Sequence, residues 1–90
     1  MKEPIEKRKQ YRDLLYQKID ENNIDLVDAL KLTRKIVGKS QQDYAHMVGL
    51  SKKIITDFER GKGNPTLDSL IKMFKPVGLI PGLKRRKILF

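Results

Sequence analysis

The sequence predicts an all-α fold, and three kinds of signal support this. Apolar residues recur at the three- and four-residue spacing of helices in five separate segments. Ser, Thr or Asp stands directly before four of these segments, where a helix needs an N-cap. Glycine or proline follows four of them and stops them. Only residues 80–90 depart from this pattern, because they are typical of a short β-strand or a basic tail.

The first predicted helix spans residues 4–22 and belongs to an amino-terminal extension, residues 1–24. Pro4 suits a first helical position, and the polar residues 21–23 end the helix. This helix has a narrow apolar stripe, which we interpret as the face that packs on the edge of the domain. The alternative is that the stripe contacts a second subunit or a partner protein. The stripe comprises Tyr11, Leu14, Leu15 and Ile19.

Four further helices are predicted in the main domain, residues 25–79. Asp25 caps the first of them, which runs to about Val37 and is stopped by Gly38. Its predicted inner face comprises Leu26, Ala29, Leu30 and Thr33, extended by Ile36 or Val37. Thr66 caps the last helix, which Pro76 and Gly78 end. Its predicted core stripe comprises Leu67, Leu70, Ile71 and Phe74.

Residues 40–61 form the most informative segment, because they predict two short helices joined by a tight turn at Gly49. Ser40 and Ser51 are the expected N-caps, and Gly49 supplies the positive φ that ends the first helix. The faces that remain exposed offer Gln41, Lys52 and Lys53 to a polyanion. This arrangement is a helix-turn-helix, and it favours double-stranded DNA as the partner.

The charge balance agrees with a nucleic-acid partner. Twenty basic residues against 11 acidic ones give a net charge of +9. Residues 1–25 are neutral, residues 26–61 have a charge of +3, and residues 62–90 have a charge of +6. Attraction to phosphate dominates non-specific nucleic-acid affinity, although basic residues also serve plain solubility.

Several functional classes are excluded or disfavoured by composition. The chain has no cysteine and a single histidine, His46, so thiolate and imidazole metal clusters are excluded, and we expect no metal and no cofactor. His46 is the single histidine that a Ser/His/Asp catalytic set could use, and the sequence has no phosphate-binding glycine loop. We therefore do not expect an enzyme. No apolar run approaches a membrane span, and we expect a cytoplasmic protein.

Residues 29–79 resemble the Xre-type helix-turn-helix family, which includes phage repressors and many antitoxin DNA-binding subunits. The resemblance implies a five-helix, lambda-repressor-like helix-turn-helix domain. The predicted fold adds to it an extra N-terminal helix, which matches no part of the family core, and a short C-terminal β-strand that pairs across a dimer or is a frayed tail. The residues that match the family pattern at the correct spacing are Arg34, Gly38, Ser40-Gln41, Ala45, Gly49, Ser51, Glu59-Arg60-Gly61 and Asn64-Pro65-Thr66-Leu67.

Two further features resemble HipB-type antitoxins of type II toxin–antitoxin systems. They are residues 29–34, which lead into Gly38, and the basic C-terminal segment. This resemblance implies a homodimer on an inverted-repeat operator, repression of its own operon, and capture of a HipA-like kinase toxin. It also implies that residues 80–90 pair across the dimer, the alternative being a frayed tail. A HigA-type antitoxin, a stand-alone Xre-type regulator and a toxin-binding interaction module remain alternatives.

The resemblance also assigns roles to individual residues. It places Lys52 and Lys53 at base and phosphate contacts in the major groove, with Thr56 and Asp57 one turn further and Ser51 at the helix start. Asp57 has the wrong sign for DNA, and we prefer pairing with Lys53, four residues earlier, over a contact with a cytosine amino group.

The remaining assignments concern phosphate contacts and one structural pair. The resemblance implies that Gln41 grips a phosphate at a helix start. Lys39 and Lys62 flank the same surface as electrostatic contacts or as solvated side chains. Arg34 and Glu59 are implied to form a structural ion pair between the first core helix and the end of the recognition helix.

Overall fold

Helix boundaries in this protein lie where the sequence supplies caps. The computed structural model describes residues 5–82, and every regular element in that range is helical. The elements are α1 (Ile5–Asp20), α2 (Leu26–Val37), α3 (Gln41–Val48), α4 (Lys52–Glu59), α5 (Leu67–Phe74) and the 3-10 turn η1 (Lys75–Val77). The prediction of an all-α fold is therefore confirmed for the described residues.

Four helices begin with a side chain that accepts a backbone hydrogen bond from the third residue after it. Asp25 accepts from the Asp28 amide at 2.8 Å, and Thr66 accepts from the Ser69 amide at 3.1 Å. Ser40 and Ser51 cap α3 and α4 in the same way, each at 3.2 Å. Each cap satisfies one of the amide groups that the first turn of a helix leaves without a partner.

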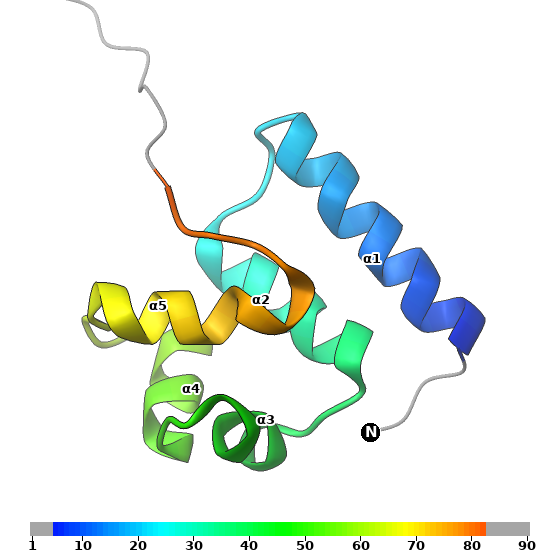
Figure 1. The fold of residues 1–90 in the computed structure, drawn as a ribbon. Coiled ribbons are helices and arrows are strands. Elements are labelled where there is room, and N and C mark those ends of the chain that lie inside the picture. Colours follow the sequence, from blue (N-terminus) through cyan, green and yellow to red (C-terminus); the bar gives the residue numbers. More distant parts are fainter. Residues whose placement is uncertain (1–4, 83–90) are drawn as a thin grey trace, which may run out of the picture.

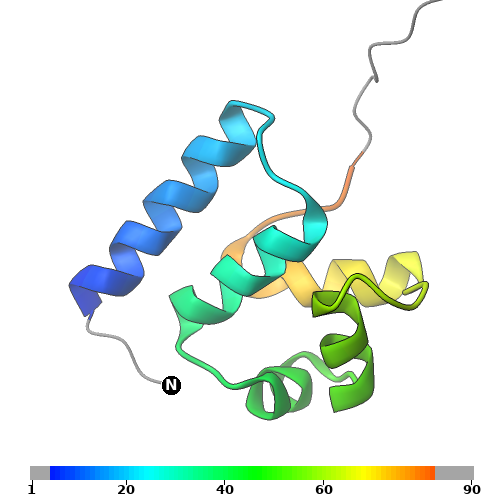
Figure 2. The ribbon, with the colours of Figure 1, turned by 180° about the vertical axis from the view of Figure 1, so that it is seen from behind.

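Helix α2 is the centre of the arrangement, with α1 along one side of it and α3, α4 and α5 on the other (Figures 1 and 2). Two contacts fix α1. The Tyr16 hydroxyl donates a hydrogen bond of 3.0 Å to the carbonyl of Val77, and the Lys35 ammonium lies 5.3 Å from the centre of the Tyr11 ring. The N-terminal helix therefore packs against the domain as an additional layer.

One apolar core joins all five helices. Leu15 of α1, Leu30 of α2, Tyr44 of α3, Ile55 of α4 and Met73 of α5 are all fully buried in it. The Tyr44 hydroxyl donates a short hydrogen bond to the Met73 carbonyl, which links α3 to α5. Burial raises the pKa of Tyr44, and the opposing charge of Arg34 does not cancel this effect. Tyr44 is therefore a neutral, structural donor.

Four residues predicted to face the core are exposed instead. Leu26 and Leu67 are 48% and 65% exposed, and each is the first residue of its helix. Ile71 of α5 and Leu14 of α1 are 42% and 40% exposed. In α5 the buried face is centred on Ser69, Met73 and Phe74, and therefore lies to one side of the predicted stripe. Periodicity alone does not define which part of an apolar stripe another helix covers.

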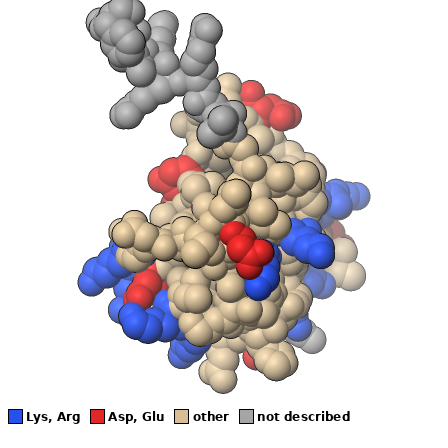
Figure 3. All heavy atoms as spheres, turned by 60° about the vertical axis from the view of Figure 1, so that its left-hand side comes forward, with Lys and Arg blue, Asp and Glu red and all other residues tan. Residues whose placement is uncertain are grey.

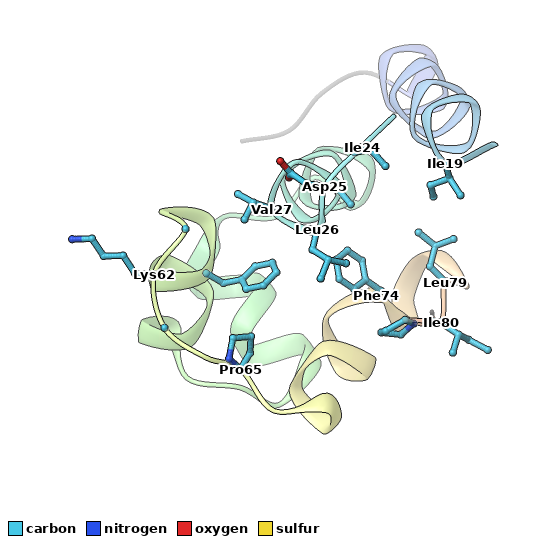
Figure 4. A pocket seen from close by; sticks show the side chains of 16 residues that line it. Ile19, Ile24, Asp25, Leu26, Val27, Lys62, Pro65, Phe74, Leu79 and Ile80 are labelled. Atoms are coloured by element: carbon cyan, nitrogen blue, oxygen red, sulfur yellow. The ribbon is translucent and has the colours of Figure 1, made fainter. Parts of the chain in front are cut away.

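An apolar groove of about 740 Å³ opens between the end of α1, the start of α2, the end of α4 and residues 79–82 (Figure 4). We call it the C-terminal groove. Its apolar lining includes Ile19, Leu26, Val27, Phe58, Phe74, Leu79 and Ile80. Sequence periodicity did not predict this groove.

The predicted strand at residues 80–90 is not seen in the part that the structure describes. Residues 79–82 form neither strand nor helix, and residues 83–90 lie outside the described residues, as does Pro4. Within the described residues the N-terminal helix spans Ile5–Asp20, so it ends two residues before the predicted end at residue 22, and Asn22 follows it with a φ of 54°. Among residues 5–82 no helix is both long enough and apolar enough to cross a membrane.

Candidate nucleic-acid interface

The turn between α3 and α4 is built from backbone conformation and two caps. Gly49 adopts a φ of 79°, in the left-handed region that glycine enters without steric cost. Its amide and that of Leu50 bond back to carbonyls of α3, the latter to Ala45 at 2.9 Å. Ser51 then caps α4. This geometry leaves the first turn of α4, with Lys52 and Lys53, exposed to solvent.

Arg34 of α2 and Glu59 of α4 form a bidentate ion pair. The Arg34 Nε and Nη2 atoms donate to the two Glu59 carboxylate oxygens at 2.5 and 2.8 Å. Their side chains are only 14% and 5% exposed. Arg34 Nη1 also donates to the Lys39 carbonyl at 3.1 Å, which fixes the segment between α2 and α3. The ion pair implied by the family resemblance is therefore present, and it is shielded from water.

Glu59 remains ionised in this partly buried position. Burial raises the pKa of its carboxyl. Hydrogen bonds from Arg34 and Gln41 and the positive charges of Arg34 and Lys31 lower this pKa by more than burial raises it. The net effect is a pKa below the ordinary value of 4.5. The charge of Glu59 therefore supports the fold above that pH.

Gln41 connects the two helices of the motif through both ends of its amide group. Its Nε2 donates to Glu59 Oε1 at 3.0 Å, and its Oε1 accepts from the Thr56 hydroxyl at 3.0 Å. A side-chain amide has two N–H donors, so one donor of Gln41 is left for a ligand. Arg34, Gln41, Thr56 and Glu59 thus form one hydrogen-bonded network that fixes α4 relative to α2 and α3.

Lys53 and Asp57 form an ion pair along the outer face of α4. The Lys53 Nζ atom lies 2.7 Å from Asp57 Oδ2, and the Lys53 side chain is 82% exposed. The hydrogen bond from Lys53 is the main cause that lowers the pKa of Asp57, with Arg60 and Lys62 adding positive charge. Lys52 is exposed and forms no ion pair within residues 5–82. The ion pair between Lys53 and Asp57 that the sequence favoured is therefore present in the structure.

The other two predicted cations lie at different places on the surface. Lys39 is exposed between α2 and α3, close to the Gln41 end of the network. Lys62 follows α4, where its amide donates to the Asp57 carbonyl at 2.8 Å, and it borders the C-terminal groove (Figure 4). An eight-residue helix is about 12 Å long. Lys62 is therefore at the opposite end of α4 from Lys52.

Charge is distributed unevenly over the surface of the molecule. Figure 3 shows several Lys and Arg side chains together in the lower left of the view, and two groups of Asp and Glu in its upper half. Wide areas between these groups have neither sign. Figure 3 also shows Lys and Arg side chains along its right-hand side, so the basic residues on this face lie in more than one group.

Comparison with known proteins agrees with this geometry. The model of the helix-turn-helix family matches residues 30–79, which is more than half of the chain and includes α3, α4 and α5. The chain belongs to the helix-turn-helix family. An uncharacterized HTH-type transcriptional regulator of Haemophilus influenzae is 31% identical to it over 64 residues. That alignment covers 69% of this chain and 65% of the relative, so the chain spans less than two thirds of the relative's length. No solved structure matches the chain.

One residue of this helix-turn-helix was missed by the sequence analysis. A shallow depression of about 370 Å³ is lined by Arg34, Ser40, Gln41, Gln42 and Lys52. Gln42 is exposed in the first turn of α3, next to Gln41. Its position beside the N-cap was the available signal, since the second residue of a helix lies close to the free amide groups. The depression lies between the starts of α3 and α4, where the predicted phosphate and base contacts also lie.

Proposed function

We propose that this protein is a DNA-binding transcriptional regulator that inserts the start of α4 into the major groove. The network of Arg34, Gln41, Thr56 and Glu59 is the observation that best supports this, because it fixes α4 rigidly while its first turn stays exposed. A recognition element needs this combination of rigidity and exposure. The similarity to the HTH-type transcriptional regulator of Haemophilus influenzae supports the same function.

The proposed contacts follow from the geometry of the site. Lys52 is available to donate to guanine O6 and N7, and Lys53 to a phosphate or base if it leaves Asp57. The free amide donor of Gln41, the amides at the start of α3 and Lys39 bind a backbone phosphate. Thr56 offers its methyl group to a thymine while its hydroxyl stays bonded to Gln41.

The finer proposal is that the regulator is a homodimeric repressor that binds an inverted-repeat operator in the cytoplasm and has no catalytic activity. We further propose, on the resemblance to HipB-type proteins, that it is an antitoxin that binds a HipA-like kinase toxin. The HigA-type antitoxin and the stand-alone regulator are the competing proposals. The protein encoded beside it tests this, because co-expression must relieve the toxicity of that neighbour if the chain is an antitoxin.

The DNA proposal is tested with a duplex selected from a pool with a randomised centre. Lys52→Ala/Lys53→Ala is compared with Lys72→Ala/Lys75→Ala, which removes the same charge from α5 and η1. We expect the first variant to lose its preference for the selected duplex over a random one, at about 1–3 kcal/mol per lost base contact. The control retains it. An unchanged preference in Lys52→Ala/Lys53→Ala rejects the proposed role of α4.

A further inference from the structure

The C-terminal groove is an exposed apolar surface, and of the residues that the sequence assigned to DNA only Lys62 lines it. Leu26 and Ile80 border it and are 48% and 85% exposed. None of its lining residues comes from residues 39–57, so it lies apart from α3 and from the start of α4. Concave apolar surfaces of this size are typical of binding sites.

We propose that this groove binds the C-terminal segment, residues 83–90, of a second copy of the chain, so that two copies exchange their C-terminal segments. The proposal goes beyond DNA binding, because the exchange requires no nucleic acid. In this arrangement each C-terminal segment binds the groove of the other copy, whereas the resemblance to HipB-type antitoxins implies that the two segments pair with each other.

The composition of residues 83–90 matches the groove. The segment ends in Ile88-Leu89-Phe90, and an aromatic residue beside aliphatic ones is a common anchor in an apolar pocket. Four consecutive basic residues, 84–87, precede these three. Asp25 lies in the lining of the groove, and the exposed Asp20 and Glu21 lie between the lining residues Ile19 and Ile24. Acidic groups are therefore available for the basic part, and among residues 5–82 Lys62 is the only basic residue in the lining.

The backbone at the end of the described chain favours a second copy over the same chain. Pro81 and Gly82 line the groove, so residues 83–90 begin at its edge. To fill the same groove, the chain must reverse at once, and the type II turn that a Pro-Gly pair favours does this with a positive φ at glycine. Gly82 is not among the glycines with positive φ. Residues 79–82 instead lead away from α5 (Figure 1).

Reach and symmetry are compatible with exchange. Eight extended residues span about 26 Å, which is sufficient to reach the groove of an adjacent molecule. Reciprocal exchange fills both grooves and produces a closed pair with two-fold symmetry. Each copy then covers the exposed Leu26 and Ile80 of the other.

The first test measures the mass of the full chain by light scattering without DNA. We expect the unaltered chain to have twice the mass of a 10.5 kDa monomer. Leu26→Asp and Phe90→Asp should each halve it. Leu67→Asp, an exposed apolar residue outside the groove, should leave it unchanged. Thermal melting by circular dichroism verifies that each variant is folded, and Leu26→Asp adds an acid to the first turn of α2, where it is favourable.

A monomeric unaltered chain overturns the proposal, and so does a dimer that survives Leu26→Asp or Phe90→Asp. Loss of the dimer in Leu67→Asp also overturns it, because the interface then includes the exposed face of α5. Lys52→Ala/Lys53→Ala should remain dimeric, so failure of this proposal and failure of the DNA proposal are distinguishable.

The second test uses the absence of cysteine from the sequence. A Leu26→Cys chain is mixed with a Phe90→Cys chain and oxidised. We expect the disulfide between positions 26 and 90 to form faster than either self-linked dimer. Faster linkage of two position-90 thiols indicates that the segments pair with each other. A Leu26→Cys/Phe90→Cys chain that runs as a linked monomer indicates docking in its own groove. Either of these two results overturns the proposal.

Discussion

The Thr56 hydroxyl of α4 donates a hydrogen bond of 3.0 Å to the side-chain oxygen of Gln41, the first residue of α3. Two residues assigned to DNA by the sequence therefore bind each other in the free protein. Gln41 also binds Glu59, which is paired with Arg34, so a contact between Gln41 and a phosphate acts on a side chain that is already ordered. Binding then has little side-chain entropy to remove at this position.

The Arg34–Glu59 pair should be worth far more to stability than an exposed pair. We expect Arg34→Met to lower the free energy of unfolding by about 3 kcal/mol, because Glu59 is left buried without its cation. Replacing both partners by apolar residues should cost less than that single change. Asp68→Asn, which breaks the exposed pair with Lys72, should cost less than about 1 kcal/mol. Urea unfolding measures all three, and equal losses for Arg34→Met and Asp68→Asn contradict the prediction.

The lowered pKa of Glu59 predicts a loss of stability in acid. Its pKa in the folded protein is below 4.5, so the unfolded chain takes up a proton first as the pH falls. The stabilisation is complete above pH 4.5 and is lost progressively below it. Asp57 acts in the same direction, because its pKa is also lowered. Melting temperatures should therefore fall less steeply with acid in Glu59→Gln than in the unaltered chain; identical slopes count against this assignment.

Asp57 should limit non-specific DNA binding. Asp57→Asn removes an anion from the outer face of α4 and releases Lys53 from its 2.7 Å contact. We expect tighter binding to random duplex, with about one more counterion released, as seen in the salt dependence of the affinity. Asp68→Asn makes the same charge change beside Lys72 and serves as the control. The prediction fails if the two variants show equal salt dependence.

Gly49 should resist substitution for a conformational reason alone. An added methyl group meets no atom within 4 Å, but the φ of 79° disfavours any residue with a side chain. Gly49→Ala should lower the free energy of unfolding by about 1 kcal/mol. Gly82→Ala, where space is also open and φ is not positive, is the matched control and should have no effect. Chemical denaturation compares the two.

Sequence was most informative where structure depends on neighbours in the chain. Caps such as Ser40 and Ser51, and the spacing of Lys53 and Asp57, are local and could be predicted. The bond between Gln41 and Thr56 depends on how two helices cross, which no periodicity specifies. Leu26 and Leu67 show the same limit, because an apolar stripe identifies a face but not the helix that covers it. Leu26, which is left uncovered in this way, lines the C-terminal groove.

The end of α5 is completed by two tyrosines from distant parts of the chain. Tyr44 and Tyr16, 29 and 61 positions away, donate to the carbonyls of Met73 and Val77. A peptide of residues 64–82 alone has neither phenol, and short helices are marginal in water. We therefore expect the last turns of α5 and η1 to be stable only when α1 and α3 are packed against them. Folding of the carboxyl-terminal part is in this way coupled to the amino-terminal helix, although the two are at opposite ends of the sequence.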